Sequence, residues 1–292
     1  MYPIRPMIRR PLSSPGRVAL LIGAVVFWAA NIGLIINHQL AVERLPDTPP
    51  NIANDGVVYQ TTDYSCGPAC LATLFSQYNI IRSEREWAQL AGTNLALGTR
   101  LSGLQQAGDT FGFETVELNP SFTQLDLIMH PAIVFQSAEY HLTTFWGMDD
   151  AGMAIIRDPA LGRISWGPAD YIQNVIGNPK LLVFYPGTVP RCDPESAPVE
   201  IARFQNMLRS LGYFRGGITG RWSDRLANAI RSFQRSMDLE PTGVVDPATS
   251  IYLEGAWHVV VNGPVAPFMQ IDRSDATASR TVPIMTRLNP GR

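Results

Sequence analysis

The most regular hydrophobic feature of the chain is an uncharged stretch near its beginning. The 20 residues Val18–Asn37 are almost all apolar, and as an α-helix they would span roughly 30 Å, the thickness of a bilayer core. The run is longer than the apolar part of a signal peptide, and no A-x-A cleavage site follows Ile36. We therefore expect an uncleaved anchor rather than a cleaved signal peptide or a buried core helix.

Charge is distributed unevenly around this stretch. Residues 1–42 contain no Asp or Glu, but they hold Arg5, Arg9, Arg10 and Arg17. Because arginines are retained on the cytoplasmic side, we predict a cytoplasmic tail at 1–17 and a single pass through the inner (cytoplasmic) membrane at 18–37. Everything after the anchor then lies outside, which in a Gram-negative bacterium is the periplasm. Residues 38–56, with three prolines, are predicted to form a linker.

The rest of the chain divides by pattern into two domains. Residues 57–186 mix helical and strand periodicities, residues 187–198 are a proline-rich linker, and residues 199–254 are helical only. Ser, Thr, Pro and Ala dominate 255–292, which we expect to be a partly disordered tail. The predicted fold class is an α+β domain with an antiparallel sheet, a small all-α three-helix domain and one N-terminal transmembrane helix.

A cysteine stands where a helix is predicted to begin. In Cys66-Gly67-Pro68 the proline suits a first helical turn, and mainly apolar residues follow. A thiolate at a helix N-terminus is stabilised by the helix dipole and by free N–H groups, and it is the attacking species in cysteine peptidases. Gln60, six residues upstream, can offer its amide to an oxyanion beside the Cys66 N–H.

A catalytic thiolate needs a base, and the chain has four histidines. His38 lies at the membrane boundary, His258 lies beyond the second domain, and His130 precedes Pro131 and a predicted strand at Ala132–Gln136. His141 remains, and we interpret it as the general base.

A hairpin is predicted to bring an orienting carboxylate to this histidine. His141 opens a strand over 141–147, a turn follows at 149–152, and a second strand over 153–157 leads to Asp158. Because His141 and Asp158 stand at the outer ends of this hairpin, they should lie close together. Asp158 would then hold the imidazole through its other nitrogen.

These residues together resemble a known family. Gln60, the run Cys66-Gly67-Pro68-Ala69, Tyr140-His141 and Arg157-Asp158-Pro159 are similar to the motifs of the C39 peptidases, which are papain-like cysteine peptidases known for clipping double-glycine leaders in bacteriocin exporters. The resemblance implies a papain-like fold over about 130 residues, with Cys66 as nucleophile, His141 as base, Asp158 as orienter and Gln60 as oxyanion donor. The chain departs from the exporters because it has a single predicted span and no P-loop, so export-coupled leader cleavage is not implied.

The other two cysteines carry no predicted role in catalysis. Cys70 shares a helix face with Cys66 and is interpreted as a core residue, while Cys192 lies in the second linker. An odd number of cysteines outside the cytoplasm leaves a free thiol or an intermolecular bridge, and the spacing does not choose among pairings. No zinc-site spacing is present, and we expect neither a metal nor a cofactor.

The second domain shows apolar residues at helical spacing. A first helix is predicted from Ile201, Phe204, Leu208 and Leu211, and Gly212 stops it. A second helix is predicted from Leu226, Ala229, Ile230 and Phe233. Asp246-Pro247 begins a third helix, which is predicted to end near Leu253. The pairs Phe204-Gln205 and Phe233-Gln234 and the run Thr242-Gly243 resemble peptidoglycan-binding domains of wall hydrolases. Near the turns, Tyr213, Phe214 and Trp222 are candidates to line a groove for glycan or peptide, the alternative for each being a place in the core.

Two functions of different class follow from this organisation. The first is an anchored envelope cysteine peptidase that acts on a peptide or protein while tethered to peptidoglycan. The second is a non-catalytic peptidoglycan-binding tether or assembly factor, because the arrangement is similar to the periplasmic half of the ATPase that helps assemble type II secretion systems. The partners implied are peptidoglycan, the inner membrane, a peptide substrate and, in the second case, secretion machinery. The net charge of −2 indicates no nucleic-acid partner.

Overall fold

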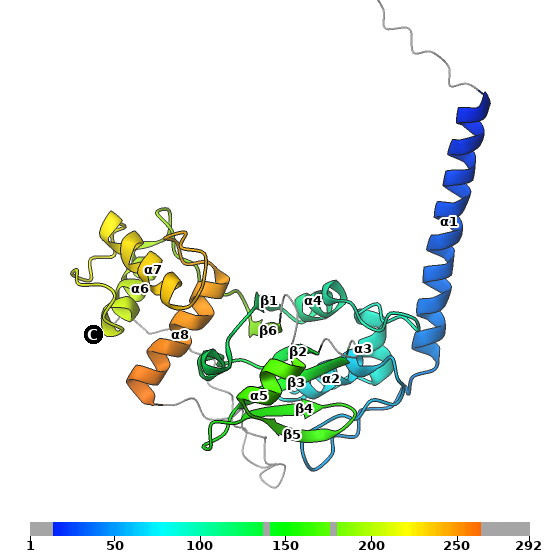
Figure 1. Ribbon diagram of the computed structural model, residues 1–292, viewed down its shortest axis with the longest axis horizontal. Helices are drawn as coiled ribbons and strands as arrows, with labels where there is room; N and C mark the ends of the chain where they lie inside the picture. Colours follow the sequence, from blue (N-terminus) through cyan, green and yellow to red (C-terminus); the bar gives the residue numbers. More distant parts are fainter. Residues whose placement is uncertain (1–13, 137–140, 176–179, 264–292) are drawn as a thin grey trace, which may run out of the picture.

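The structure is a computed structural model that describes residues 14–136, 141–175 and 180–263 (Figure 1). Its helices are α1 (Ser14–Glu43), α2 (Cys66–Ser76), α3 (Glu84–Leu90), α4 (Leu101–Thr110), the 3-10 helix η1 (Phe122–Leu127), α5 (Pro168–Asn174), α6 (Pro198–Ser210), α7 (Asp224–Ser236) and α8 (Pro247–Asn262). Its strands are β1 (Phe113–Leu118), β2 (Ala132–Gln136), β3 (His141–Met148), β4 (Ala154–Asp158), β5 (Gly162–Trp166) and β6 (Leu181–Pro186).

An antiparallel sheet in the order β1-β6-β2-β3-β4-β5 forms the centre of the α+β domain, which agrees with the fold class predicted from the sequence. Successive side chains of a strand point to opposite faces, and both faces of this sheet are buried. Leu142 and Leu182 pack on one face in a cluster with α2, whereas Phe145 and Val183 pack on the other in a cluster that continues into the C-terminal helices. The predicted hairpin of β3 and β4 is present, and its strands pair with Thr144 opposite Arg157.

Helix α1 contains the predicted span and continues past it to Glu43. Figure 1 shows it projecting from the rest of the molecule, and its apolar side chains, such as Phe27 and Trp28, are about two-thirds exposed at 66% and 67%. The stretch Leu21–Glu43 is long and apolar enough to cross a membrane. Contacts within the protein leave this apolar surface uncovered, whereas contact with lipid would cover it.

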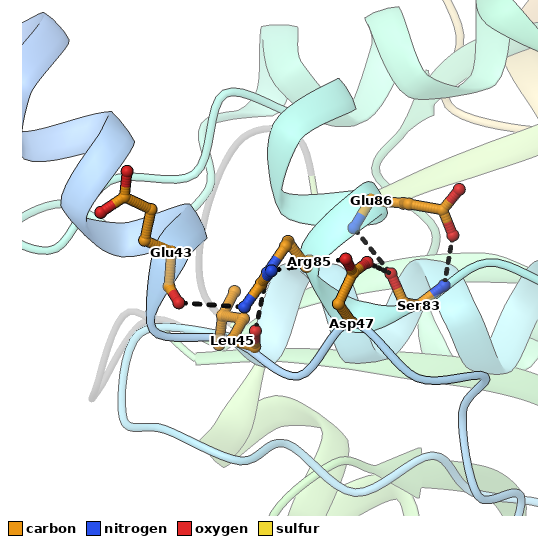
Figure 2. A network of polar contacts seen from close by, with 6 residues as sticks. All are labelled: Glu43, Leu45, Asp47, Ser83, Arg85 and Glu86. Atoms are coloured by element: carbon orange, nitrogen blue, oxygen red, sulfur yellow. Dashed lines mark hydrogen bonds and ion pairs between the residues drawn. The ribbon is translucent and has the colours of Figure 1, made fainter.

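Residues 38–56, the predicted linker, begin within α1 and are ordered. The last turns of α1 and the chain that follows dock on the α+β domain, burying Ala41 and Leu45 completely or nearly so. Arg85 of α3 donates to the carbonyl oxygens of Glu43 and Leu45 at 3.1 and 2.9 Å (Figure 2). The prolines stiffen this segment, but contacts that no hydrophobic periodicity reveals hold it in place.

The C-terminal region is the predicted three-helix unit. Gly212, with φ +80°, ends the first helix as expected, but α8 continues to Asn262 instead of ending near Leu253. Two glutamines that the sequence marked only as motif positions explain how the turns hold. Gln205 accepts from the N–H groups of Thr219 and Gly220, and Gln234 accepts from that of Gly243. Each buried amide therefore supplies the hydrogen bonds that a tight turn lacks.

The two domains pack against each other, and the predicted linker 187–198 takes part in this packing. Cys192 is fully buried, and its N–H and C=O pair with those of Val245 at 3.0 and 2.8 Å. Helix α8 lies so close to η1 that a Cβ on Gly255 would stand 2.0 Å from the Leu127 carbonyl oxygen. The predicted tail at 255–292 thus begins as ordered helix, and residues 264–292 lie outside the described residues.

Candidate active site

Cys66 is the first residue of α2, as its Gly-Pro context predicted. The Ser65 side chain does not cap the helix but instead exchanges hydrogen bonds with the backbone of Thr62. The first N–H groups of a helix have no intrahelical acceptor. Because the Ser65 side chain does not occupy them either, no capping side chain competes for the N–H groups of Cys66 and Gly67. Gly67 is required here because a Cβ would stand 2.3 Å from the Thr99 hydroxyl oxygen, where loop 93–99 crosses the start of α2.

His141 and Asp158 form the pair that the hairpin predicted. Nε2 of His141 lies 2.9 Å from Oδ1 of Asp158, and the two side chains are 17% and 3% exposed. The same Asp158 oxygen accepts from the N–H groups of Ala160 and Leu161 at 2.7 and 3.1 Å, which fixes the carboxylate in the turn after β4. These contacts keep Asp158 ionised: burial raises its pKa, but the hydrogen bonds from His141 and from this turn outweigh burial and lower the pKa below 3.8.

The imidazole of His141 lies between a carboxylate and a thiol. Burial alone would lower its pKa, but hydrogen bonds to the side chains of Asp158 and Cys66, together with their charges, raise that pKa from 6.5 to about 9. The imidazolium is therefore favoured at neutral pH, beside the sulfur that it would pair with as a thiolate. A thiolate–imidazolium pair is the form that a cysteine peptidase needs before its substrate arrives.

Gln60 lies next to this set. Its backbone N–H donates to the carbonyl oxygen of Pro159 at 2.9 Å, which places it beside the turn that holds Asp158. Its side-chain Nε2 donates to the Thr62 carbonyl at 2.9 Å, and among the described residues its buried Oε1 has no hydrogen-bond partner. An amide nitrogen carries two N–H groups, so one remains for an oxyanion.

The remaining cysteines are buried free thiols. Burial raises the pKa of Cys70 well above 9, and its sulfur donates to the Leu142 carbonyl at 3.2 Å, in keeping with a core role. Burial also raises the pKa of Cys192 to about 12. All three cysteines are unpaired, so Cys66 keeps the reduced sulfur that a nucleophile requires. His130, whose ring is tilted against that of Tyr185, lies at the opposite end of β2 from the strand end that pairs with His141.

Arg157, which the sequence marked only as a motif position, supports the site. Its guanidinium stacks 3.5 Å above the ring of Trp146 and donates to the Gly56 carbonyl at 3.1 Å. Burial and the charge of nearby Arg163 together lower its pKa to about 10, against the attraction of Asp55. The contact ties β4 to the segment that leads to Gln60, a long-range link that a strand pattern does not encode.

The three aromatic candidates of the helical domain are not equivalent. Phe214 is 4% exposed and belongs to the core, the alternative to a place in a binding groove. Tyr213 and Trp222 are half-buried, and the Tyr213 hydroxyl shares a hydrogen bond of 2.7 Å with Ser236. Only these two retain a surface that a wall polymer could contact.

Comparison with known protein families divides the chain in the same way. The sequence profile of the peptidase C39 family matches residues 54–174, and that of a peptidoglycan-binding domain matches residues 199–251. An uncharacterized protein of the archaeon Methanothermobacter marburgensis is 34% identical over 113 residues, covering 39% of this chain and 78% of its own. A protein of Methanothermobacter thermautotrophicus is 33% identical over 115 residues, covering 39% and 79%.

Solved structures are similar at lower identity. The peptidase domain of Streptococcus ComA, a bifunctional ABC transporter of a quorum-sensing pathway, is 24% identical with a TM-score of 0.41, covering 44% of this chain and 97% of that one. A periplasmic domain of the EpsAB fusion protein of the Vibrio vulnificus type II secretion system is 12% identical with a TM-score of 0.33, covering 72% and 88%.

Proposed function

We propose that the chain is a membrane-anchored cysteine peptidase of the cell envelope, on the premise that residues 54–174 match the peptidase C39 family. Helix α1 would hold it in the inner membrane with the N-terminus in the cytoplasm, and the C-terminal domain would bind peptidoglycan in the periplasm. The observation that supports catalysis best is that His141 is hydrogen-bonded both to Asp158 and to Cys66, the first residue of α2.

In this proposal the Cys66 thiolate attacks the carbonyl carbon of a peptide bond and forms a carbon–sulfur bond. The carbonyl oxygen becomes an oxyanion, which the N–H of Cys66 and the amide of Gln60 stabilise. His141 gives its proton to the leaving amine as the carbon–nitrogen bond breaks. Water then attacks the thioester while His141 takes a proton from it, releasing the carboxylic acid and restoring the thiolate. Asp158 keeps the imidazole oriented throughout.

The peptidoglycan-binding domain would determine where this chemistry occurs. It packs directly on the α+β domain through α8 and η1, so wall contact by Tyr213 or Trp222 would hold the whole peptidase near the murein. The substrate class that this favours is a peptide or protein accessible between membrane and wall.

The test is labelling of the full chain in detergent with a thiol-directed peptide probe. We expect Cys66 to be labelled, His141→Ala to lose most of the labelling, and Cys192→Ala, which removes a remote thiol, to label like the parent. Equal labelling of the His141→Ala protein and the parent would contradict catalysis. The alternative, a non-catalytic tether or an assembly factor for a secretion system, would then describe the chain better, provided that it still sediments with peptidoglycan.

A further inference from the structure

The end of α1 is fixed to the α+β domain, so the domain has one position relative to the helix. The carbonyl groups at a helix C-terminus lack partners and carry partial negative charge. Arg85 donates to two of the carbonyl groups here, those of Glu43 and Leu45, and also pairs with Asp47 at 3.4 Å (Figure 2). Tyr64, two residues before the nucleophile, donates to the Ala41 carbonyl at 3.1 Å. The helix and the domain therefore move together.

One loop of the domain lies beside the last turn of the apolar span. The side-chain oxygen of Asn37 accepts from the N–H of Leu95 at 2.8 Å, and Nδ1 of His38 lies 2.7 Å from the carbonyl oxygen of Thr93. Counted back from Asn37, 20 residues of helix fill a bilayer core of roughly 30 Å. Asn37 is therefore at the membrane–water interface if α1 spans the membrane, and the loop joined to it is at the same level.

The loop has the composition and bonding of a segment that enters an interface. Its tip, residues 95–97, reads Leu-Ala-Leu, and Leu97 is 57% exposed although large and apolar. Asn94 and Gly98 pair their backbones through two hydrogen bonds of 2.9 Å, and the Ala96 N–H donates to the Asn94 side chain at 2.9 Å. Four of the five N–H groups of loop 94–98, those of Asn94, Leu95, Ala96 and Gly98, are therefore bonded within the protein, which lowers the cost of bringing this backbone into an apolar phase. Arg100, exposed just beyond the tip, suits lipid phosphate.

We propose that loop 94–98 is a second membrane contact, with Leu97 inserted in the interfacial region of the same bilayer that holds α1. This inference rests on the anchor of the proposed function. The same loop continues to Thr99, which packs on Gly67 beside Cys66. The nucleophile would therefore work next to the lipid surface, on polypeptides that are membrane-bound or emerging from the membrane, rather than deep in the periplasm.

The experiment places an environment-sensitive NBD fluorophore on single cysteines of the full chain in phospholipid vesicles. The background is Cys66→Ala, since Cys70 and Cys192 are buried. The labelled variants are Leu34→Cys in the span, Leu97→Cys in the loop and Ile172→Cys on α5, which is 73% exposed and remote from α1 (Figure 1). Quenching by nitroxide lipids reports lipid contact, and quenching by iodide reports contact with water.

We expect nitroxide lipids to quench the fluorophores at 34 and 97 but not the one at 172. A fluorophore at 97 quenched like that at 172, with 34 still quenched by lipid, would overturn the loop contact and leave the anchor intact. Absence of lipid quenching at 34 would overturn the anchor, and with it both the tethered peptidase and this inference. Leu97→Glu provides a second check. In vesicles that contain this variant, iodide should quench a fluorophore at position 96 faster than in the parent, because the loop would leave the bilayer for water.

Discussion

Replacing Asp158 with Asn changes the charge that faces His141 and little else. Oδ1 of the amide can still accept from the N–H groups of Ala160 and Leu161, so the turn after β4 should persist. In the parent protein, burial opposes protonation of His141. The hydrogen bonds to Asp158 and Cys66, together with the charges of these two groups, outweigh burial and raise the pKa of His141 from 6.5 to about 9. Asp158 is the leading cause of this rise, so replacing it should lower the pKa of His141 by at least about 1, which corresponds to about 1.4 kcal/mol.

The shift also links protonation to stability, with a defined sign. A pKa raised on folding adds stability that is fully present below the unfolded value of 6.5 and is lost as pH rises through about 9. The whole difference corresponds to about 3 kcal/mol at 1.4 kcal/mol per unit, and partial solvent contact of the ring reduces it to about 2 kcal/mol. The parent should therefore lose stability between pH 6.5 and 9, and Asp158→Asn should lose less.

NMR of 15N-labelled histidine measures the pKa of His141, because the chain has only four histidines to resolve, and denaturant unfolding between pH 6.5 and 9 measures the stability. The control is Asp149→Asn, the same change in a carboxylate that also accepts backbone N–H groups, at the other end of the β3–β4 hairpin. It should leave the His141 pKa near 9. If Asp158→Asn also left it near 9, the carboxylate would not be what holds the proton, and the reasoning about the pair would fail.

Alkylation of Cys66 should stay fast at pH 6 in the parent and fall with His141→Ala, since an ordinary thiol is only about 0.3% ionised there; equal rates in the two proteins would contradict the ion pair. A reporter fused after Asp47 should be active only outside the cytoplasm, and cytoplasmic activity would reverse the topology. Trp222→Ala should weaken co-sedimentation with peptidoglycan while the helical domain stays folded, whereas Phe214→Ala should cost about 3–5 kcal/mol of stability by leaving a cavity. Gly255→Ala should cost about 1–3 kcal/mol, read from thermal unfolding, because its Cβ meets the Leu127 carbonyl.

Local chemistry made the site predictable. A Gly-Pro pair after Cys66 indicates a helix start, and a turn midway between His141 and Asp158 brings hairpin ends together, so the three residues followed from short-range rules. Phe214 was harder to place because an aromatic residue near a turn fits a groove and a core equally well, and burial distinguishes them only after folding.

Long-range packing was not predictable from the same rules. The proline-rich segments 38–56 and 187–198 have linker composition, yet Leu45 and Cys192 within them are buried. Their partners, such as Arg85 and Val245, are 40 and 53 residues away along the chain, and no periodicity records a contact at that separation. Helix α8 is longer than predicted for a similar reason, because η1 packs against the part of the helix beyond Leu253.

The shared core between the two domains bears on how such a chain can evolve. A peptidoglycan-binding unit that is joined by a free tether can be exchanged, duplicated or lost without harming its neighbour. Here one hydrophobic cluster runs from Val116 and Val183 of the sheet to Ile201 and Tyr252 of the helical unit. Recombination within 187–198 would divide that cluster and leave apolar surface on both products. The two units are therefore expected to be inherited together, with insertions confined to exposed turns such as the one at Asp150.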